Sequence, residues 1–167
     1  MAIHTNSLQH VAASIRHEEP RDWANTYSQA LVDASWRATS DDPGLEPTRV
    51  LIVDDDVQST LSLQLLLHEL GYCTTRVAVS GAAALEIAQK FSPSVVLLAL
   101  ELPDMSAYDV AWRLREHNEL RRVRLIALTG DYEHTYRDLA RRAGFERFLA
   151  KPVSAPVLRN LLRANLS

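Results

Sequence analysis

The hydrophobic positions follow two different spacings that alternate along most of the chain. From Arg49 onward, short apolar runs are each followed by a longer stretch whose apolar residues recur at helical spacing. This pattern predicts strands over 50–53, 73–79, 95–100, 123–128 and 148–150, and helices that end near 70, 91, 117, 143 and 164. Continuous apolar runs such as Val95 to Leu100 are typical of parallel strands that helices cover on both faces. We therefore expect an α/β fold with a five-stranded, parallel, doubly wound sheet.

The first 39 residues show only the helical spacing. Their apolar side chains form two stripes on either side of Pro20: Leu8, Val11, Ala12 and Ile15, and then Trp23, Tyr27, Ala30, Leu31 and Ala34. We predict a helical N-terminal extension over 1–39, a linker rich in turn formers and acids over 40–48, and a globular domain over 49–167. Two arrangements of the extension are open: docking on its own domain, or pairing with another chain.

Composition limits the classes of function. The net charge is −3, and the single cysteine, Cys73, cannot form an internal disulfide. A chain without an overall basic field is a poor candidate for binding nucleic acid. No apolar run approaches the roughly 20 residues that a membrane-spanning helix needs. We expect a cytoplasmic protein that binds neither nucleic acid nor a membrane.

Polar side chains follow three of the predicted strands. Asp54 and Asp55 come directly after the first, Thr129 after the fourth and Lys151 after the fifth. The carboxyl ends of parallel strands meet at one edge of an open sheet, where such folds bind ligands. Two carboxylates at 4 Å repel each other by roughly 4 kcal/mol at an effective dielectric of 20, so the pair predicts a cation nearby, with Mg²⁺ as the obvious candidate. The third acid, Asp56, is expected to cap the following helix instead.

These residues belong to four short motifs in a definite order, listed here: Val53-Asp54-Asp55-Asp56, residues 97–106, Ala127-Leu128-Thr129-Gly130 and Lys151-Pro152. From about Arg49 to Leu166 the chain resembles the receiver domain of bacterial two-component response regulators. The resemblance implies the sheet order 2-1-3-4-5. It also implies that Asp54 and Asp55 are the acid pair that holds Mg²⁺, Thr129 the phosphate-sensing hydroxyl, Phe148 the aromatic switch position and Lys151 the active-site lysine.

The main departure from the pattern of that family lies at the acceptor position, and a milder one lies at Ser106-Ala107, where the family often has Asp-Gly. The resemblance places the phosphorylated aspartate at the end of the third strand, four residues before Pro103, and Ala99 stands there. Alanine has no oxygen to phosphorylate, so we predict a pseudo-receiver that acts by phosphorylation-independent protein–protein interaction. We expect no catalytic residue, no required cofactor and at most weak Mg²⁺ binding. Without the acceptor carboxylate, Lys151 is expected to pair with Asp54 and Asp55 as an internal counter-ion.

The partners that the resemblance implies are proteins: a histidine kinase, another regulator or an output protein. Homodimers are predicted through the N-terminal helices or through the face made by the fourth receiver helix, the fifth strand and the fifth helix. A first alternative is a conventional, phosphorylatable receiver in which Ala99 is an engineered change. A remote alternative is a phosphatase of the haloacid-dehalogenase type, whose acidic motif the run Asp54 to Asp56 resembles. In phosphatases of that type the lysine precedes the late acidic motif, whereas in this chain Lys151 follows the candidate acid Asp131.

Overall fold

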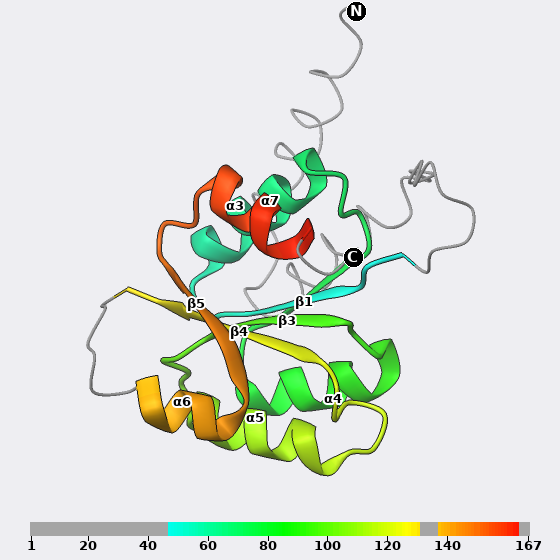
Figure 1. The fold of residues 1–167 in the computed structure, drawn as a ribbon, viewed down its shortest axis with the longest axis vertical. Coiled ribbons are helices and arrows are strands. Elements are labelled where there is room, and N and C mark those ends of the chain that lie inside the picture. Colours follow the sequence, from blue (N-terminus) through cyan, green and yellow to red (C-terminus); the bar gives the residue numbers. More distant parts are fainter. Residues whose placement is uncertain (1–46, 131–136, 164–167) are drawn as a thin grey trace, which may run out of the picture.

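The computed structural model describes residues 47–130 and 137–163 (Figure 1). Within these ranges strands and helices alternate, as the hydrophobic pattern predicts. Numbered as in Figure 1, the elements are β1 (Val50–Val53), α3 (Val57–Glu69), β2 (Thr75–Ala78), α4 (Gly81–Phe91), β3 (Val95–Ala99), α5 (Ala107–Glu116), β4 (Arg124–Thr129), α6 (Arg137–Ala143), β5 (Phe145–Ala150) and α7 (Ala155–Arg163). The predicted extension over 1–39 and most of the predicted linker lie outside the described residues.

The five strands form one parallel sheet in the order β2-β1-β3-β4-β5, which confirms the predicted topology. Val50, at the start of β1, lies opposite Thr75 of β2 and Val95 of β3. β4 pairs with β3 on one side and with β5 on the other. Each pair of consecutive strands is joined through a helix, as a parallel connection requires.

Two hydrophobic cores lie on opposite faces of the sheet. Successive side chains of a strand point to opposite faces. Leu51 and Val53 therefore join the core that α4, α5 and α6 cover, whereas Val50 and Ile52 join the core that α3 and α7 cover. Figure 1 shows these two helical layers above and below the sheet. All four β1 residues are fully buried, which explains why the strand is continuously apolar.

Two strand boundaries differ from the prediction by more than one residue. β2 begins at Thr75, so Cys73 is not a strand residue but lies half-buried in the preceding loop, where partial burial raises the pKa of its thiol. β5 begins three residues earlier than predicted, at Phe145. It is an edge strand, and Glu146 and Arg147 near its start are exposed. Because these two residues are polar, the hydrophobic pattern does not indicate the beginning of the strand.

The glycines that follow α3 and α6 adopt the left-handed conformation. Gly71 has a φ of 92° and Gly144 a φ of 93°, which costs glycine little because it has no Cβ. The Gly71 N–H donates to the His68 carbonyl at 3.0 Å, so the chain turns sharply out of α3 toward β2. None of the helices in 47–130 and 137–163 has the length and apolarity to cross a membrane.

Candidate functional site

The carboxyl ends of four neighbouring strands bring the predicted site residues to one edge of the sheet. Val53 pairs with Leu98, so the residues that follow them, Asp54 just after β1 and Ala99 at the end of β3, lie level with each other. Ala99 is the last residue of β3, and Thr129 is the last of β4. The Lys151 N–H, just beyond β5, donates to the Thr129 carbonyl at 2.8 Å. The site that the sequence predicts is therefore assembled by the parallel register.

Asp54 and Lys151 form an ion pair at the centre of this edge. The Lys151 Nζ lies 2.5 Å from Asp54 Oδ2, and the Asp54 side chain is only 2% exposed, against 27% for Lys151. Within the described residues, the buried Oδ2 accepts no bond of hydrogen-bond geometry, so the ammonium satisfies this oxygen by charge. The other oxygen, Oδ1, accepts the Asp56 N–H at 3.1 Å. The predicted internal counter-ion for Asp54 is present.

The three consecutive acids have different surroundings. Asp54 is buried, whereas Asp55 and Asp56 are exposed. Asp56 is the N-cap of α3, and its Oδ1 accepts the Gln58 N–H at 3.1 Å, which confirms the capping role predicted for it. The sequence predicts Asp54 and Asp55 as one pair, but among the described residues the Lys151 ammonium contacts Asp54 and not Asp55.

The residues suited to Mg²⁺ are Asp54 and Asp55, since carboxylate oxygens are the ligands this ion prefers. Between residues 47 and 163, leaving out 131–136, no group of three His, Cys, Asp or Glu side chains lies close enough together to hold a metal ion. Lys151 already provides positive charge at Asp54. The two carboxylates fit a Mg²⁺ ion that is held by few protein ligands and has water in the rest of its coordination shell.

Ala99 presents only a methyl group at the centre of the edge. Its side chain is buried, 1% exposed, and belongs to a strand that is buried along its whole length. Thr129 and Phe148 are half-buried on the neighbouring strands. Phe148 pairs with Ala127 and packs against the core beneath α4, α5 and α6. Glu101, two residues after Ala99, is exposed.

The loop that follows β3 is fastened to the start of α4 by Asp104, a residue that sequence reasoning did not single out. Its two carboxylate oxygens accept the Gly81 N–H at 2.8 Å and the Ala82 N–H at 2.9 Å. Ser80 caps the same helix by accepting the Ala83 N–H at 3.2 Å. A carboxylate at a helix N-terminus meets both free amides and the positive end of the helix dipole. These bonds lower the pKa of Asp104.

We expect Asp104→Asn to lower the free energy of unfolding by about 0.5–1 kcal/mol at pH 7, the usual range for an exposed capping carboxylate. The pKa of Asp104 is lower in the folded protein, so its contribution is present above the unfolded-state pKa of about 3.9. It is lost as the pH falls through the folded-state pKa. Urea melts at pH 7 and pH 3 measure this difference. Glu119→Gln, which changes an exposed acid in the turn after α5, is the control. A loss equal at both pH values contradicts the account.

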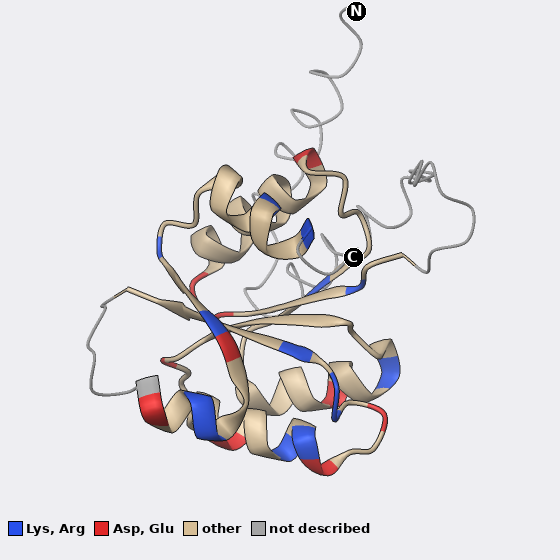
Figure 2. Ribbon diagram, viewed as in Figure 1, with Lys and Arg blue, Asp and Glu red and all other residues tan. Residues whose placement is uncertain are grey.

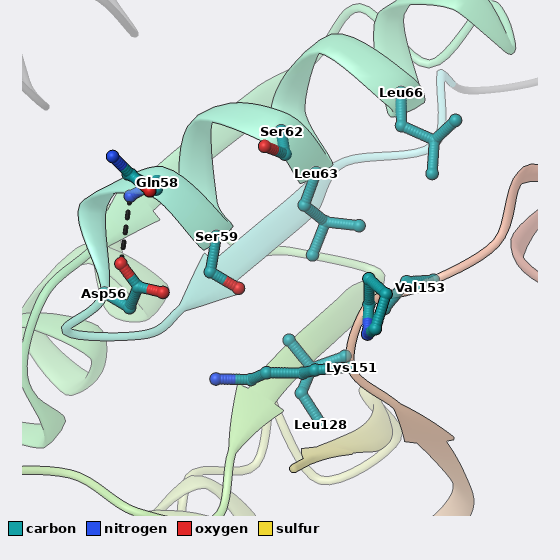
Figure 3. Close-up of a pocket in the computed structure, with 10 residues that line it drawn as sticks. Asp56, Gln58, Ser59, Ser62, Leu63, Leu66, Leu128, Lys151 and Val153 are labelled. Atoms are coloured by element: carbon teal, nitrogen blue, oxygen red, sulfur yellow. Dashed lines mark hydrogen bonds between the residues drawn. The ribbon is translucent and has the colours of Figure 1, made fainter.

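A pocket of about 390 Å³ opens beside the ion pair, between α3 and the loop from β5 to α7. Figure 3 shows Ser59, Ser62 and Leu63 of α3 on one side and Lys151 and Val153 on the other. The peptide bond between Lys151 and Pro152 is cis. The full lining comprises Asp56, Gln58, Ser59, Ser62, Leu63, Leu66, Leu128, Lys151, Pro152 and Val153. The pocket is partly apolar and has the Lys151 ammonium at one end.

Comparison with known proteins identifies the family. The family model described as response regulator receiver domain matches residues 50–163. The polar-differentiation response regulator DivK of Brucella anthropi is 31% identical over 110 residues, covering 66% of this chain and 89% of DivK. DivK of Brucella ovis is 32% identical over 107 residues, covering 64% and 86%. The chain belongs to the response regulator receiver family, and so to two-component signalling.

Solved structures agree with this assignment. Vibrio cholerae chemotaxis protein CheY4 superposes with a TM-score of 0.67 at 23% identity, covering 71% of this chain and 98% of CheY4, which shows the shared fold. The receiver domain of the Pseudomonas aeruginosa sensor histidine kinase PA1611 gives a TM-score of 0.65 at 26% identity, covering 71% and 97%. That structure holds a magnesium ion in its active-site cleft.

Proposed function

We propose that this protein is a receiver that acts through phosphorylation-independent binding of another protein. The observation that carries the proposal is Ala99, the buried last residue of β3, level with Asp54 at the carboxyl edge of the sheet. By the family resemblance this position belongs to the acceptor aspartate. A methyl group cannot form the acyl phosphate that adds charge to a receiver and shifts its surface. The proposal is tested by treating the chain with acetyl phosphate and Mg²⁺, with Ala99→Asp as the positive control.

The ion pair between Asp54 and Lys151 supports a site whose buried charge is balanced without a phosphoryl group. A buried carboxylate is costly unless it is paired, and Asp54 has both the Lys151 ammonium and the Asp56 N–H as partners. In this proposal Lys151 acts as a permanent counter-ion, and Thr129 and Phe148 are no longer moved by a phosphoryl group. Mg²⁺ binds weakly through Asp54 and Asp55 and is not required.

The partners in this proposal are proteins of the same signalling system: a histidine kinase, another regulator or an output protein. One candidate surface is the face formed by α6, β5 and α7. Arg141, Arg142 and Arg147 are exposed on α6 and β5, and Arg159 and Arg163 are exposed on α7. Exposed arginines of this kind suit a partner with an acidic surface. Their charge would speed the approach of the partner and fix its orientation more than it would raise the affinity. The protein is proposed to work in the cytoplasm as a binding module rather than as an enzyme.

Restoring a carboxylate at position 99 should destabilise the protein when no metal is present. We expect Ala99→Asp to lower the free energy of unfolding by about 1–2 kcal/mol in EDTA, because the new charge faces Asp54 and is only partly offset by Lys151. Mg²⁺ should reduce this loss, since the ion binds the folded form in preference. Ala99→Asn adds nearly the same volume without the charge and is the matched control. Denaturant melts in which Ala99→Asp is as stable as Ala99→Asn in EDTA contradict the proposal.

A further inference from the structure

Helix α3 differs from the other helices in having almost no charge. Its 13 residues, VQSTLSLQLLLHE, contain a single acid, Glu69, and no lysine or arginine. Figure 2 shows α3 as an uncoloured helix except at its end, whereas α4 and α5 carry charged residues along their outer sides. Glu86 and Lys90 on α4 form an exposed ion pair of the kind expected at a solvated helix surface. α3 has no lysine or arginine with which its acid could form such a pair along the helix.

The leucines of α3 extend around the helix. Leu63 and Leu67 are buried against the sheet, as expected for the inner side. Leu61 and Leu66 are half-buried, and Leu65, on the outer side, is 44% exposed. A solvated helix of a globular protein has one apolar stripe, and a helix that is apolar on most sides is normally covered. α3 departs from the single-stripe pattern at Val57 and Leu65, which are exposed, whereas its other exposed residues, Gln58, Ser62 and Glu69, are polar.

The pocket of about 390 Å³ described above continues this apolar surface. Leu63 and Leu66 of α3 line it together with Val153 of the loop from β5 to α7. Leu66, Leu70 and Val153 also lie at the margin of the core that α3 and α7 cover. Positive charge lies beside this surface, at Lys151 and at the exposed arginines of α7, Arg159 and Arg163. The surface suits an apolar segment from an acidic stretch of chain.

The chain itself contains such a segment outside the described residues. A stripe of five apolar side chains at helical spacing comprises Trp23, Tyr27, Ala30, Leu31 and Ala34. An amphipathic helix of this length is marginal in water unless its apolar side is packed against something. Residues 1–48 carry three arginines against seven acids, a net charge of −4. This negative charge is compatible with the side of the domain that carries Lys151, Arg159 and Arg163.

The connection is long enough for the segment to reach this surface. The chain enters the fold at Val50, where β1 pairs with the first residue of β2, Thr75. α3 returns to this end of the sheet before β2 begins, so Leu70 lies at the same end as Val50. The 15 residues from Ser35 to Arg49 span up to about 50 Å when extended, and α3 is only about 20 Å long.

We propose that residues 23–34 form an amphipathic helix that packs across the outer side of α3 and into the pocket beside Lys151 of the same chain. The tether favours the same chain over a second copy, because a short linker raises the effective concentration of the segment to the millimolar range. A protein that binds to the same surface competes with the docked segment. This proposal does not depend on whether Ala99 prevents phosphorylation.

Photo-crosslinking in the full-length protein tests this contact. A benzophenone amino acid replaces Ser62, an exposed residue of α3 that lines the pocket, and in a control protein it replaces Gln89, exposed on α4. After illumination of a dilute sample, we expect Ser62 to be joined to the peptide containing residues 23–34 at the mass of one chain. We expect no such product from Gln89. Products that join two chains, a yield no greater than at Gln89, or products lacking residues 23–34 overturn the proposal.

A matched pair of tryptophan substitutions makes the test specific for the apolar stripe. Trp23 lies on the stripe and Trp36 lies off it. With the crosslinker at position 62, Trp23→Ser should lower the equilibrium constant for docking by about tenfold, from the lost burial of one large apolar side chain, and the crosslink yield should fall with the docked population. Trp36→Ser should leave the yield close to that of the unsubstituted chain. Equal effects of the two substitutions contradict a contact made by this stripe.

Discussion

Replacing Lys151 with methionine should lower the free energy of unfolding by about 2–3 kcal/mol at pH 7. Methionine keeps much of the length of the side chain but leaves the buried Asp54 carboxylate without its cation. Removing one partner of a buried ion pair typically costs about 3–5 kcal/mol. We place the expected loss below that range because the Lys151 side chain is 27% exposed, so water still reaches the site and screens it. Urea unfolding followed by circular dichroism measures the effect.

An exposed ion pair between a lysine and a glutamate in the same protein provides the control. Lys90 lies 2.8 Å from Glu86, and these side chains are 77% and 70% exposed. Lys90→Met should therefore change stability little. In the double variant Asp54→Asn with Lys151→Met, the loss should be smaller than in Lys151→Met alone, because no buried charge is left unpaired. If Lys151→Met costs no more than Lys90→Met, Lys151 does not compensate Asp54.

The strands that could be predicted from the sequence are those buried on both faces. β1 and β3 are apolar at every position because helices cover both sides of the sheet, and their predicted positions match the structure to within one residue. At the edges of the sheet this signal fails. β5 contains Glu146 and Arg147 in exposed positions, and the strand predicted over 73–79 begins in a loop, at Cys73. Whether a strand lies at the edge of the sheet depends on the topology of the whole sheet, and a short run of residues does not contain that information.

The site could be predicted in outline because its residues follow the ends of strands. The motifs around Asp54, Thr129 and Lys151 place them at one edge as soon as the sheet is parallel. The burial of Asp54 beside the exposed Asp55 was not predictable from two identical neighbours, since it depends on which side chain turns into the core. Asp104 was missed for a related reason: its partners are the first amides of α4, more than twenty residues earlier in the chain.

The most direct measurement of the central claim is the intact mass of the protein after incubation with acetyl phosphate and Mg²⁺, beside Ala99→Asp and Ala99→Asn treated in the same way. We expect only Ala99→Asp to gain the mass of a phosphoryl group, because it alone restores a carboxylate beside Asp54 and Lys151. If the unsubstituted chain gains that mass, another residue accepts the phosphoryl group, and phosphorylation-independent action is wrong although the receiver fold still holds.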